Sequence, residues 1–547
     1  MSASAVAVGE GGRGTRPPRV SGGLPGLGHL LELRRSPIEL FFRAWRECGE
    51  VAELRFARHP VVMLFGEDAQ EAFFRAPDEQ LDQAAAYPFM TPVFGRGVVF
   101  DATPEQRKQA LRNRSLRDQA MRGHAETIAA ETERMLGRLG ATGELDLLDF
   151  FAELTIYTSS SCLIGPEFRS ELGPELVGVF KDLERGTDAF AYVNPYLPLP
   201  SFRRRDQARA ELVRMLEGIF ERRERAERPA QDLFAVLRRL RLDDGRPRFS
   251  LDEITGMFIS MMFAGHHTTS GTAAWALIEL LRHPDELRRV TGELDELFAD
   301  GESVSHHALG AMPALENAIK EGLRLHPPLV LLMRRVVGGF EYGGFQVPEG
   351  ASVAVSPAVS NRMPEHFPEP ERFWPDRYAP GREEDRRLFA WIPFGAGRHR
   401  CVGAAFAMIQ LKAILGSLLR ACEFELAQPP GSYANDHTKM VVQLKQPCRV
   451  RYRRREAARP AASAGSARGG EAGAAPAPGR LVVEADLDLC QGHAACVGEA
   501  PELFALDRES MRVRCLAPHV PAELEEKARA AARRCPTGAL RVRAREP

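Results

Sequence analysis

The chain has 547 residues, which is too long for one ordinary hydrophobic core, so two or more domains are expected. Hydrophobic residues make up 44% of the chain and charged residues 27%, as is typical of a soluble globular protein. The formal net charge is −1, so the charge balance gives no reason to expect nucleic acid or an anionic membrane as a partner.

The first residues, MSASAVAVGEGGRG, contain no apolar run long enough for a signal peptide or an anchor. The most apolar internal run, around MFISMMFAG, is too short to span a bilayer. These two features predict a cytoplasmic protein without a transmembrane anchor. Nine cysteines are few for a disulfide scaffold, and clustered cysteines in a reducing compartment favour metal binding.

One domain boundary stands out in the composition. The stretch EAARPAASAGSARGGEAGAAPAPGR offers almost nothing to bury, so residues 455–480 are predicted to be a flexible linker. It divides a large domain, residues 25–454, from a compact tail, residues 481–547. Residues 1–24 are expected to be an N-terminal arm, and no internal repeat is visible.

The large domain is predicted to be mainly α with a minor β part. Ser250 is a good N-cap, and the acidic residues and long apolar run after it predict a helix. That helix is apolar all round, so it should be buried at the centre. The segment MPALENAIKEGLRLHPP has helical periodicity up to Pro327, and GGFEYGGFQVPEGASVAVSPA is typical of short strands.

A cysteine follows a glycine-rich loop in WIPFGAGRHRCVGAAFAMIQLKAILGSLL. Gly395 and Gly397 allow a tight turn and a close approach to something flat and bulky. Cys401 lies at the start of a long helix, where anions are favoured, so we expect it to ionise readily. A thiolate there suits an axial ligand of haem iron, whereas an isolated cysteine in such a place would be structural.

The neighbouring residues support the haem ligand. The loop resembles the haem-binding signature of the cytochrome P450 family, carried here by Phe394, Gly397, His399, Cys401 and Gly403. Upstream, in the order that the family has, Glu321 and Arg324 form its E-x-x-R pair on one helix face. Arg372, in PERF, is expected to be the third member of that buried network. The resemblance covers residues 25–454 and implies the fold and the monooxygenase chemistry of the family.

The central helix narrows the resemblance to one subfamily. In AGHHTTS, Ala264, Gly265 and Thr268 fit the family pattern, and His267 replaces its acid. That stretch resembles the sterol 14α-demethylases, and so do AYPFMTPVFGRGVVFDA, LLDFFAELTIYTSS, HPPLVLLMRR and NDHTKMVVQL. Among the sterol 14α-demethylases, the soluble bacterial members are the ones that these segments resemble most. It implies three successive oxidations that remove the 14α-methyl group of a sterol, with His267 relaying protons and Thr268 holding water or oxygen.

Other site residues are implied by position in the resemblance. The haem propionates would be held by Tyr87, Arg107, Lys108, Arg334 and His399. The substrate cavity would be lined by Phe89, Met90, Phe94, Phe263, Ala264, Leu329, Leu331, Met440 and Val441. Each residue taken singly could instead be an ordinary surface charge or plain core, and His267 could be a packing histidine. An apolar lining suits a large flat lipid.

The tail carries a second metal-binding pattern. Cys490 and Cys496, with His493 between them, are followed far along by CPTGAL, which begins at Cys535. This order resembles the small bacterial ferredoxins, a small α+β fold whose last ligand precedes proline. With three cysteines in the pattern, the resemblance implies a [3Fe–4S] cluster, with His493 as the candidate ligand of a fourth iron. Cys515 lies outside the pattern and is expected to be structural.

Several alternatives stay open at this point. The tail could be a Cys₃His zinc site made of the same four residues. The large domain could hydroxylate another terpenoid, steroid or fatty substrate, or the protein could be a haem or sterol redox sensor. The chain has no nucleotide-binding stretch, so electrons from NAD(P)H should enter through a separate ferredoxin reductase. Oxygen and a sterol are the expected substrates, and a monomer is the expected state.

Overall fold

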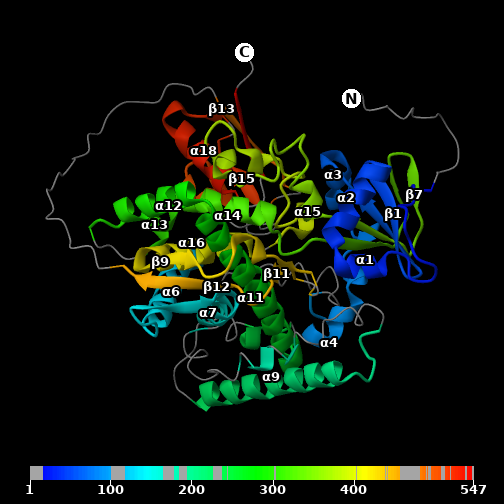
Figure 1. The fold of residues 1–547 in the computed structure, drawn as a ribbon, viewed down its shortest axis with the longest axis horizontal. Helices are drawn as coiled ribbons and strands as arrows, with labels where there is room; N and C mark the ends of the chain where they lie inside the picture. Colours follow the sequence, from blue (N-terminus) through cyan, green and yellow to red (C-terminus); the bar gives the residue numbers. More distant parts are fainter. Residues whose placement is uncertain are drawn as a thin grey trace.

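The computed structural model divides into a large helical domain and a small tail (Figure 1). It describes residues 16–99, 118–163, 165, 176, 178–180, 182–183, 194–225, 237–242, 244–300, 304–401, 403–437, 439, 441–455, 481–487, 490, 495–506, 512–517, 519–535 and 539–544. The predicted fold class, mainly α with a minor β part, is confirmed. Within the predicted linker, Arg455 is described and residues 456–480 lie outside the described residues.

The large domain contains the helices α1 (Leu30–Arg35), α2 (Pro37–Cys48), α3 (Glu67–Arg75), α4 (Thr91–Phe94), α6 (Asp118–Leu136), α7 (Leu147–Leu163), α9 (Pro200–Arg225), α11 (Leu251–Arg282), α12 (Pro284–Leu297), α13 (His306–Gly310), α14 (Pro313–Leu325), α15 (Pro357–Ser360) and α16 (Ala404–Ala421). Its strands are β1 (Val51–Phe56), β2 (His59–Leu64), β3 (Leu81–Asp82), β4 (Thr142–Asp146), β5 (Leu332–Val336), β6 (Phe340–Tyr342), β7 (Phe345–Val347), β8 (Ser352–Val355), β9 (Cys422–Leu426), β10 (Asn435–Asp436), β11 (Gln443–Leu444) and β12 (Arg449–Arg454).

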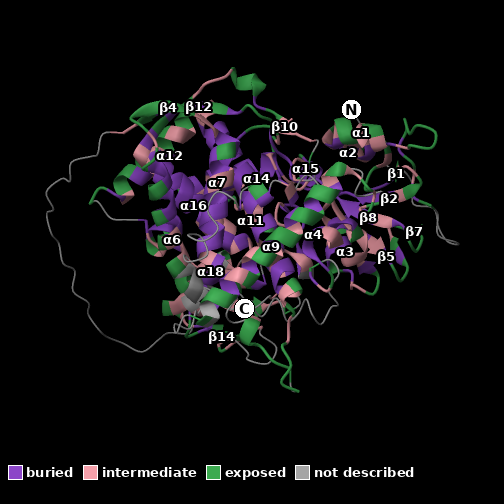
Figure 2. Ribbon diagram, turned by 90° about the horizontal axis from the view of Figure 1, so that it is seen from below, coloured by how far each residue is buried: buried purple, intermediate pink, exposed green. Residues whose placement is uncertain are grey.

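The buried central helix that the sequence predicts is α11. Ser250 caps it, because its side chain accepts from the backbone of Glu253 while the Glu253 side chain accepts from Ser250 N, 2.8 Å away. Most of its residues are buried, and it packs against α7, α14 and α16. Figure 2 shows this buried centre in purple, with exposed residues on the outer helices. The helix ends at Arg282, just before Pro284.

Helix α16 begins three residues after Cys401 and passes through the same core. It is the one helix among the described residues whose length and apolar composition would allow it to cross a membrane. Within this fold it is 67% buried, against α6, α11, α12 and α14, so its apolar surface belongs to the helical core.

A five-stranded sheet lies beside the helical core, in the order β1-β2-β8-β5-β3. β2 and β8 run parallel, and the other neighbours are antiparallel. The short strands that the sequence predicts after Gly339 are β6, β7 and β8. The described part of the predicted arm, 16–24, packs along β1: Arg19 pairs with Glu53 at 3.0 Å, and Val20 N donates to Glu53 O.

The tail forms a small α+β domain with a core of its own, as expected. Its elements are β13 (Leu481–Ala485), α17 (Ala495–Glu499), β14 (Phe504–Leu506), β15 (Val513–Cys515), β16 (His519–Val520), α18 (Glu525–Arg534) and β17 (Leu540–Ala544). β13 lies between β16 and β17, and α18 packs on α17 and β17. All four of the tail's cysteines, Cys490, Cys496, Cys515 and Cys535, contribute to this core.

Candidate active site

The loop before α16 is a tight turn closed by main-chain contacts. Cys401 N donates to Phe394 O at 2.9 Å, and both Gly395 and Gly397 have φ of +64°. A Cβ on Gly397 would stand 2.4 Å from Phe74 O, so only glycine fits this backbone against α3. The turn therefore fixes the direction in which Cys401 leaves the loop.

Cys401 is an exposed residue although its thiol is surrounded by protein atoms. Burial raises the pKa of its thiol, although a bond from the Gly403 backbone and the charge of Arg400 oppose the rise. Burial thus works against the ready ionisation that the sequence predicts for this cysteine. A sulfur that is accessible within surrounding protein faces an interior space, and its thiolate needs a cation such as iron.

A second accessible position lies in the middle of the buried helix α11. Ala264 is exposed, whereas Met262, Phe263 and His266 around it are buried. Close-packed interiors leave few voids, so an exposed alanine at this depth indicates a chamber beside the helix. Thr268 lies one turn further on and donates its hydroxyl hydrogen to Ala264 O, which leaves its oxygen able to accept.

His267 is half-buried and contacts the segment that follows β10. Gln443 Nε2 donates to His267 O at 3.1 Å and lies 3.4 Å from His267 Nδ1. The ring of Phe263 is 5.7 Å away. The adjacent His266 turns the other way, to Thr155 Oγ1 on α7 at 2.9 Å. Gln443 lies in the segment NDHTKMVVQL, but only the fold reveals its contact with His267 on α11.

The residues predicted to hold the haem propionates reach this site from separate elements. Tyr87 is half-buried and its hydroxyl accepts from Met333 N at 3.0 Å, and desolvation raises the pKa of its phenol. Arg334, on β5, is buried and donates to Phe73 O at 2.6 Å. His399 Nε2 lies 2.6 Å from Asp78 Oδ1, a partner that the sequence did not reveal. Arg107 and Lys108 lie outside the described residues.

The predicted substrate residues fall into one apolar group and several half-buried positions. Phe89, Met90, Phe94 and Phe263 belong to one core cluster, and the rings of Phe94 and Phe263 meet edge to face at 5.8 Å. Half-buried positions are Leu329, Leu331 and Val441, and Met440 lies outside the described residues.

The buried ion network contains a different third member from the one predicted. Glu321 accepts two bonds from Arg324, each 2.8 Å long, and one from Arg377 Nε at 3.1 Å. All three side chains are fully buried. Arg372 is 57% exposed and pairs with Glu369, and only its carbonyl accepts from Arg324. The assignment of Arg372 is therefore corrected to Arg377, which reaches inward from the turn Pro375–Tyr378.

The three predicted cluster cysteines share one neighbourhood in the tail. Cys496 is buried, and burial together with the charges of Cys535 and Cys490 raises its pKa to about 12. Cys490 Sγ accepts from Val513 N at 3.2 Å. Cys515 also lies within electrostatic reach of Cys490. His493 lies outside the described residues.

Comparison with known proteins settles the family of the large domain. Residues 17–451 match the family model described as Cytochrome P450. The chain belongs to the cytochrome P450 family. It is 59% identical over 442 residues to the sterol 14alpha-demethylase of Mycobacterium tuberculosis, covering 80% of this chain and 98% of that relative. It is also 36% identical over 451 residues to the obtusifoliol 14-alpha demethylase of Triticum aestivum, covering 81% and 99%.

The solved structure of retinoic acid-bound cyanobacterial CYP120A1 has the same fold as the P450 domain. The TM-score is 0.72 at 24% identity, covering 81% of this chain and all of that chain. Residues 483–542 of the tail match a model described as a 4Fe-4S single cluster domain. The chain is thus a P450 monooxygenase joined to an iron–sulfur domain of the ferredoxin type.

Membership of the P450 family implies haem, and the residues present fit that group. Cys401 would supply one thiolate ligand, as the chemistry of the family requires. Gly395 and Gly397 keep the loop free of side chains, and Ala264 leaves room beside α11. A flat group bound between α11 and the loop would cover these accessible positions.

Proposed function

We propose that this protein is a sterol 14α-demethylase that removes the 14α-methyl group in three oxidations, with electrons passed from its own iron–sulfur tail. The observation that carries the proposal is the 59% identity to a bacterial sterol 14alpha-demethylase along 98% of that protein's length. Relatives at about a third identity act, by their names, on obtusifoliol and lanosterol.

The chamber beside α11 supports a large apolar substrate. Phe94 and Phe263 form one aromatic wall, and Met90 belongs to the same apolar cluster. Leu329, Leu331 and Val441 are half-buried positions that we assign to the same lining, together with Met440. A sterol offers mainly apolar surface and few polar groups, so shape and burial would orient it.

His267 and Thr268 are proposed to handle protons and water at the reacting carbon. The Gln443 amide lies against Nδ1 and the carbonyl of His267, which would hold the ring in one orientation. The hydroxyl of Thr268 donates to Ala264 O, so its oxygen can accept from a water molecule. An imidazole ring has two nitrogens, so one can accept a proton while the other donates one, which suits it to a relay.

Haem bound through Cys401 would supply oxygen activation, and other residues would hold its carboxylates. Arg334 and Tyr87 lie together at β5, since Arg334 lowers the pKa of the Tyr87 phenol against the larger effect of burial. His399 is carried by the same loop as Cys401 and is paired with Asp78. We assign these three, with Arg107 and Lys108, to the haem propionates.

The tail is proposed to hold a [3Fe–4S] cluster on Cys490, Cys496 and Cys535. What favours a cluster over zinc is the match of residues 483–542 to a 4Fe-4S single cluster domain, which contains all three cysteines. His493 remains a candidate ligand for a fourth iron.

The proposal includes the surroundings of the enzyme. Electrons would come from NAD(P)H through a separate ferredoxin reductase, and the protein would work in the cytoplasm as a monomer. Oxygen is the second substrate. These assignments rest on the two matched domains and on the absence of a nucleotide-binding stretch from the sequence.

The test is product analysis of the purified holoprotein with lanosterol or obtusifoliol, oxygen, NADPH and a ferredoxin reductase. We expect formate and the 14-demethylated sterol in equal amounts, and neither product from Cys401→Ser. Hydroxylated sterol without formate would indicate a related hydroxylase. Sterol-induced spectral shifts without any product would indicate a sensor, and either result would overturn the proposal.

A further inference from the structure

Arg75, the last residue of α3, joins the large domain to the tail. Its Nη2 lies 3.6 Å from Asp486 Oδ2, and its Nε donates to Glu71 Oε1 at 2.6 Å. Its guanidinium also lies over the ring of Phe389, 5.4 Å from the centroid. Arg75 is therefore held in place by its own domain while it meets the tail carboxylate.

Asp486 belongs to the framework that carries the cluster cysteines. It follows β13, and its backbone N donates to Ala539 O at 2.7 Å, next to β17. Its carbonyl accepts from Cys490 N at 3.1 Å. A change in the position of Asp486 would therefore also move the backbone of Cys490, one proposed ligand of the cluster.

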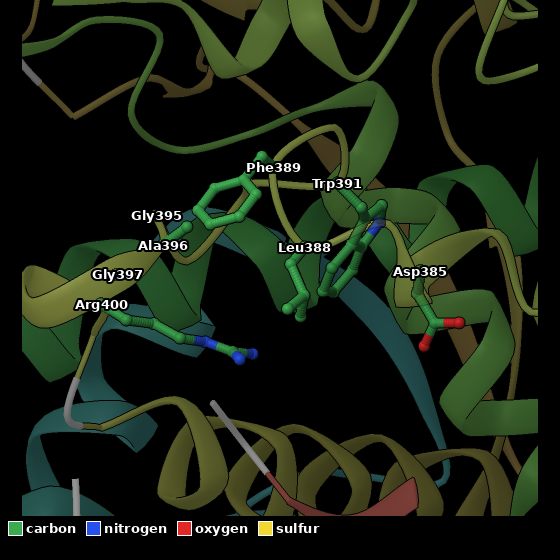
Figure 3. A pocket seen from close by; sticks show the side chains of 8 residues that line it. All are labelled: Asp385, Leu388, Phe389, Trp391, Gly395, Ala396, Gly397 and Arg400. Carbon is green, nitrogen blue, oxygen red and sulfur yellow. The ribbon is translucent and has the colours of Figure 1, made fainter. Parts of the chain in front are cut away.

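A narrow pocket lies next to this contact, below the loop of Cys401. Figure 3 shows it lined by Phe389, Leu388, Trp391 and the glycine-rich turn, with Arg400 extending across toward Asp385. A stretch of the tail, drawn in red, is visible at the lower edge of the same view (Figure 3). All the residues that line the pocket belong to the large domain, on the side where the thiolate loop lies.

The charges around Arg400 come from both domains. Burial lowers the pKa of Arg400, and the charges of Cys535 in the tail, of Cys401 and of Asp385 oppose that effect. Arg400 thus lies within electrostatic reach of one proposed cluster ligand and of the proposed haem ligand. A cation in this place would stabilise negative charge on either sulfur.

We propose that the tail docks on the face formed by α3 and residues 385–400, and that the Arg75–Asp486 ion pair sets this position. The proposal rests on the proposed function of the tail as electron donor. The named occupant is this chain's own residues 481–544. An ion pair of this kind contributes orientation and a salt-dependent attraction more than tight binding.

The test uses the full-length holoprotein and charge reversal. Asp486→Arg and Arg75→Asp each place like charges together, and the double variant restores an opposite pair. The matched control is Glu484→Arg, because Glu484 pairs with Arg543 inside the tail at 3.5 Å and changes the net charge equally. The measurements are amide hydrogen exchange of residues 67–75 and 385–400, and the rate of haem reduction by the prereduced cluster.

At low salt we expect each single reversal to raise exchange and to slow haem reduction by about three- to fivefold, as loss of one ion pair allows. The double reversal should return both values to those of the parent, and Glu484→Arg should leave them unchanged. High salt should reduce the differences. If Arg75→Asp disturbs α3, which circular dichroism would reveal, Asp486→Arg alone still tests the contact.

Single reversals that behave like Glu484→Arg would overturn this docking face, even if the cluster still reduced the haem from another position. Failure of the proposed function would be recognised by a different experimental result. A Cys496→Ser chain without cluster that turned over as fast as the parent would show that the tail is not the donor, whatever the exchange measurements gave.

Discussion

Arg377 and Arg372 are five residues apart, and their surroundings differ completely. Arg377 is fully buried against Glu321 and Glu384, whereas Arg372 is exposed beside Glu369. Removing one member of a buried charged cluster leaves the others desolvated and unpaired, and this is far more costly than losing a surface pair. The two arginines therefore form a natural matched pair of test positions.

We expect Arg377→Met to lower the free energy of unfolding by about 3–5 kcal/mol, because Glu321 and Glu384 lose a buried cation. Arg372→Met should change it by no more than about 0.5 kcal/mol. Urea unfolding followed by the haem absorbance measures both variants. Equal effects of the two substitutions would return the third place in the network to Arg372.

His266 and His267 are adjacent residues with different contacts. His266 is buried and paired with Thr155, and His267 is half-buried beside Gln443. We expect His267→Ala to lower turnover at least about tenfold and to raise hydrogen peroxide release, with sterol affinity nearly unchanged. His266→Ala should lower stability and leave the ratio of product to peroxide as it was. A normal ratio in His267→Ala would leave this residue a packing role.

The turn before α16 shows how one element depends on two glycines for different reasons. Gly395 and Gly397 share a φ of +64°, but a Cβ on Gly395 would make only ordinary contacts at 3.7 Å. On Gly397 it would meet Phe74 O at 2.4 Å. The first position has backbone strain alone, and the second adds a collision with α3.

We expect Gly395→Ala to lower the free energy of unfolding by about 1–2 kcal/mol, because alanine is strained in the left-handed conformation. Gly397→Ala should cost more, because the turn must also move away from α3. The fraction of protein that gives the thiolate spectrum of the reduced carbon monoxide complex, together with urea unfolding, measures the difference. Indistinguishable variants would mean that α3 yields without cost at this contact.

The helices α14 and α16 are tied together by a carboxylate between two lysines. Glu316 lies 2.7 Å from Lys412 on α16 and 3.0 Å from Lys320 on its own helix. Burial alone would raise the pKa of Glu316, but the two ammonium groups outweigh it and lower the pKa to about 2. Because the pKa of Glu316 is lower in the folded state, its carboxylate stabilises the fold at pH values above the pKa of the unfolded state.

The stabilisation by Glu316 should be complete above about pH 5 and should be lost as the pH falls from 4.5, the unfolded value, toward about 2. Glu316→Gln cannot titrate, so it should cost on the order of 2 kcal/mol at neutral pH and progressively less toward pH 3. Urea unfolding as a function of pH, compared with Glu371→Gln on the surface, measures this. A constant difference between variant and parent across that range would contradict the assignment.

At the scale of the whole molecule, two metal-binding domains are joined by an Ala/Gly/Pro-rich stretch. A flexible chain of the length predicted for this linker would have an r.m.s. span of about 27 Å. It would give the tail an effective concentration at the large domain on the order of millimolar. Tethering should therefore make electron delivery independent of protein concentration. The Arg75–Asp486 contact indicates where the tail would arrive.

Cutting the chain near Ser466 should leave sterol binding intact and make turnover depend on the concentration of tail. The dependence should be steeper at high salt, because the attraction between the pieces is screened. Steady-state rates of cut and intact protein, titrated with separate tail, measure it. If free tail at low micromolar concentration matched the intact chain, or if an unrelated ferredoxin were always needed, the built-in donor would be wrong.

The sequence by itself determined the features that depend on local patterns. The cap at Ser250, the glycine turn before Cys401 and the composition of the linker each concern neighbours in the chain, so propensity and motif suffice to find them. The same motifs identified the family and the fold class. The order of Cys490, Cys496 and Cys535 indicated the iron–sulfur domain in the same way.

Tertiary structure decided what depends on distant side chains. It selected Arg377 over Arg372, paired His399 with Asp78, brought Gln443 to His267 and raised the pKa of Cys401 by burial. It also set Arg75 against Asp486. Each outcome is a balance of desolvation against partners that the fold supplies from elsewhere in the chain, and no local pattern contains that balance.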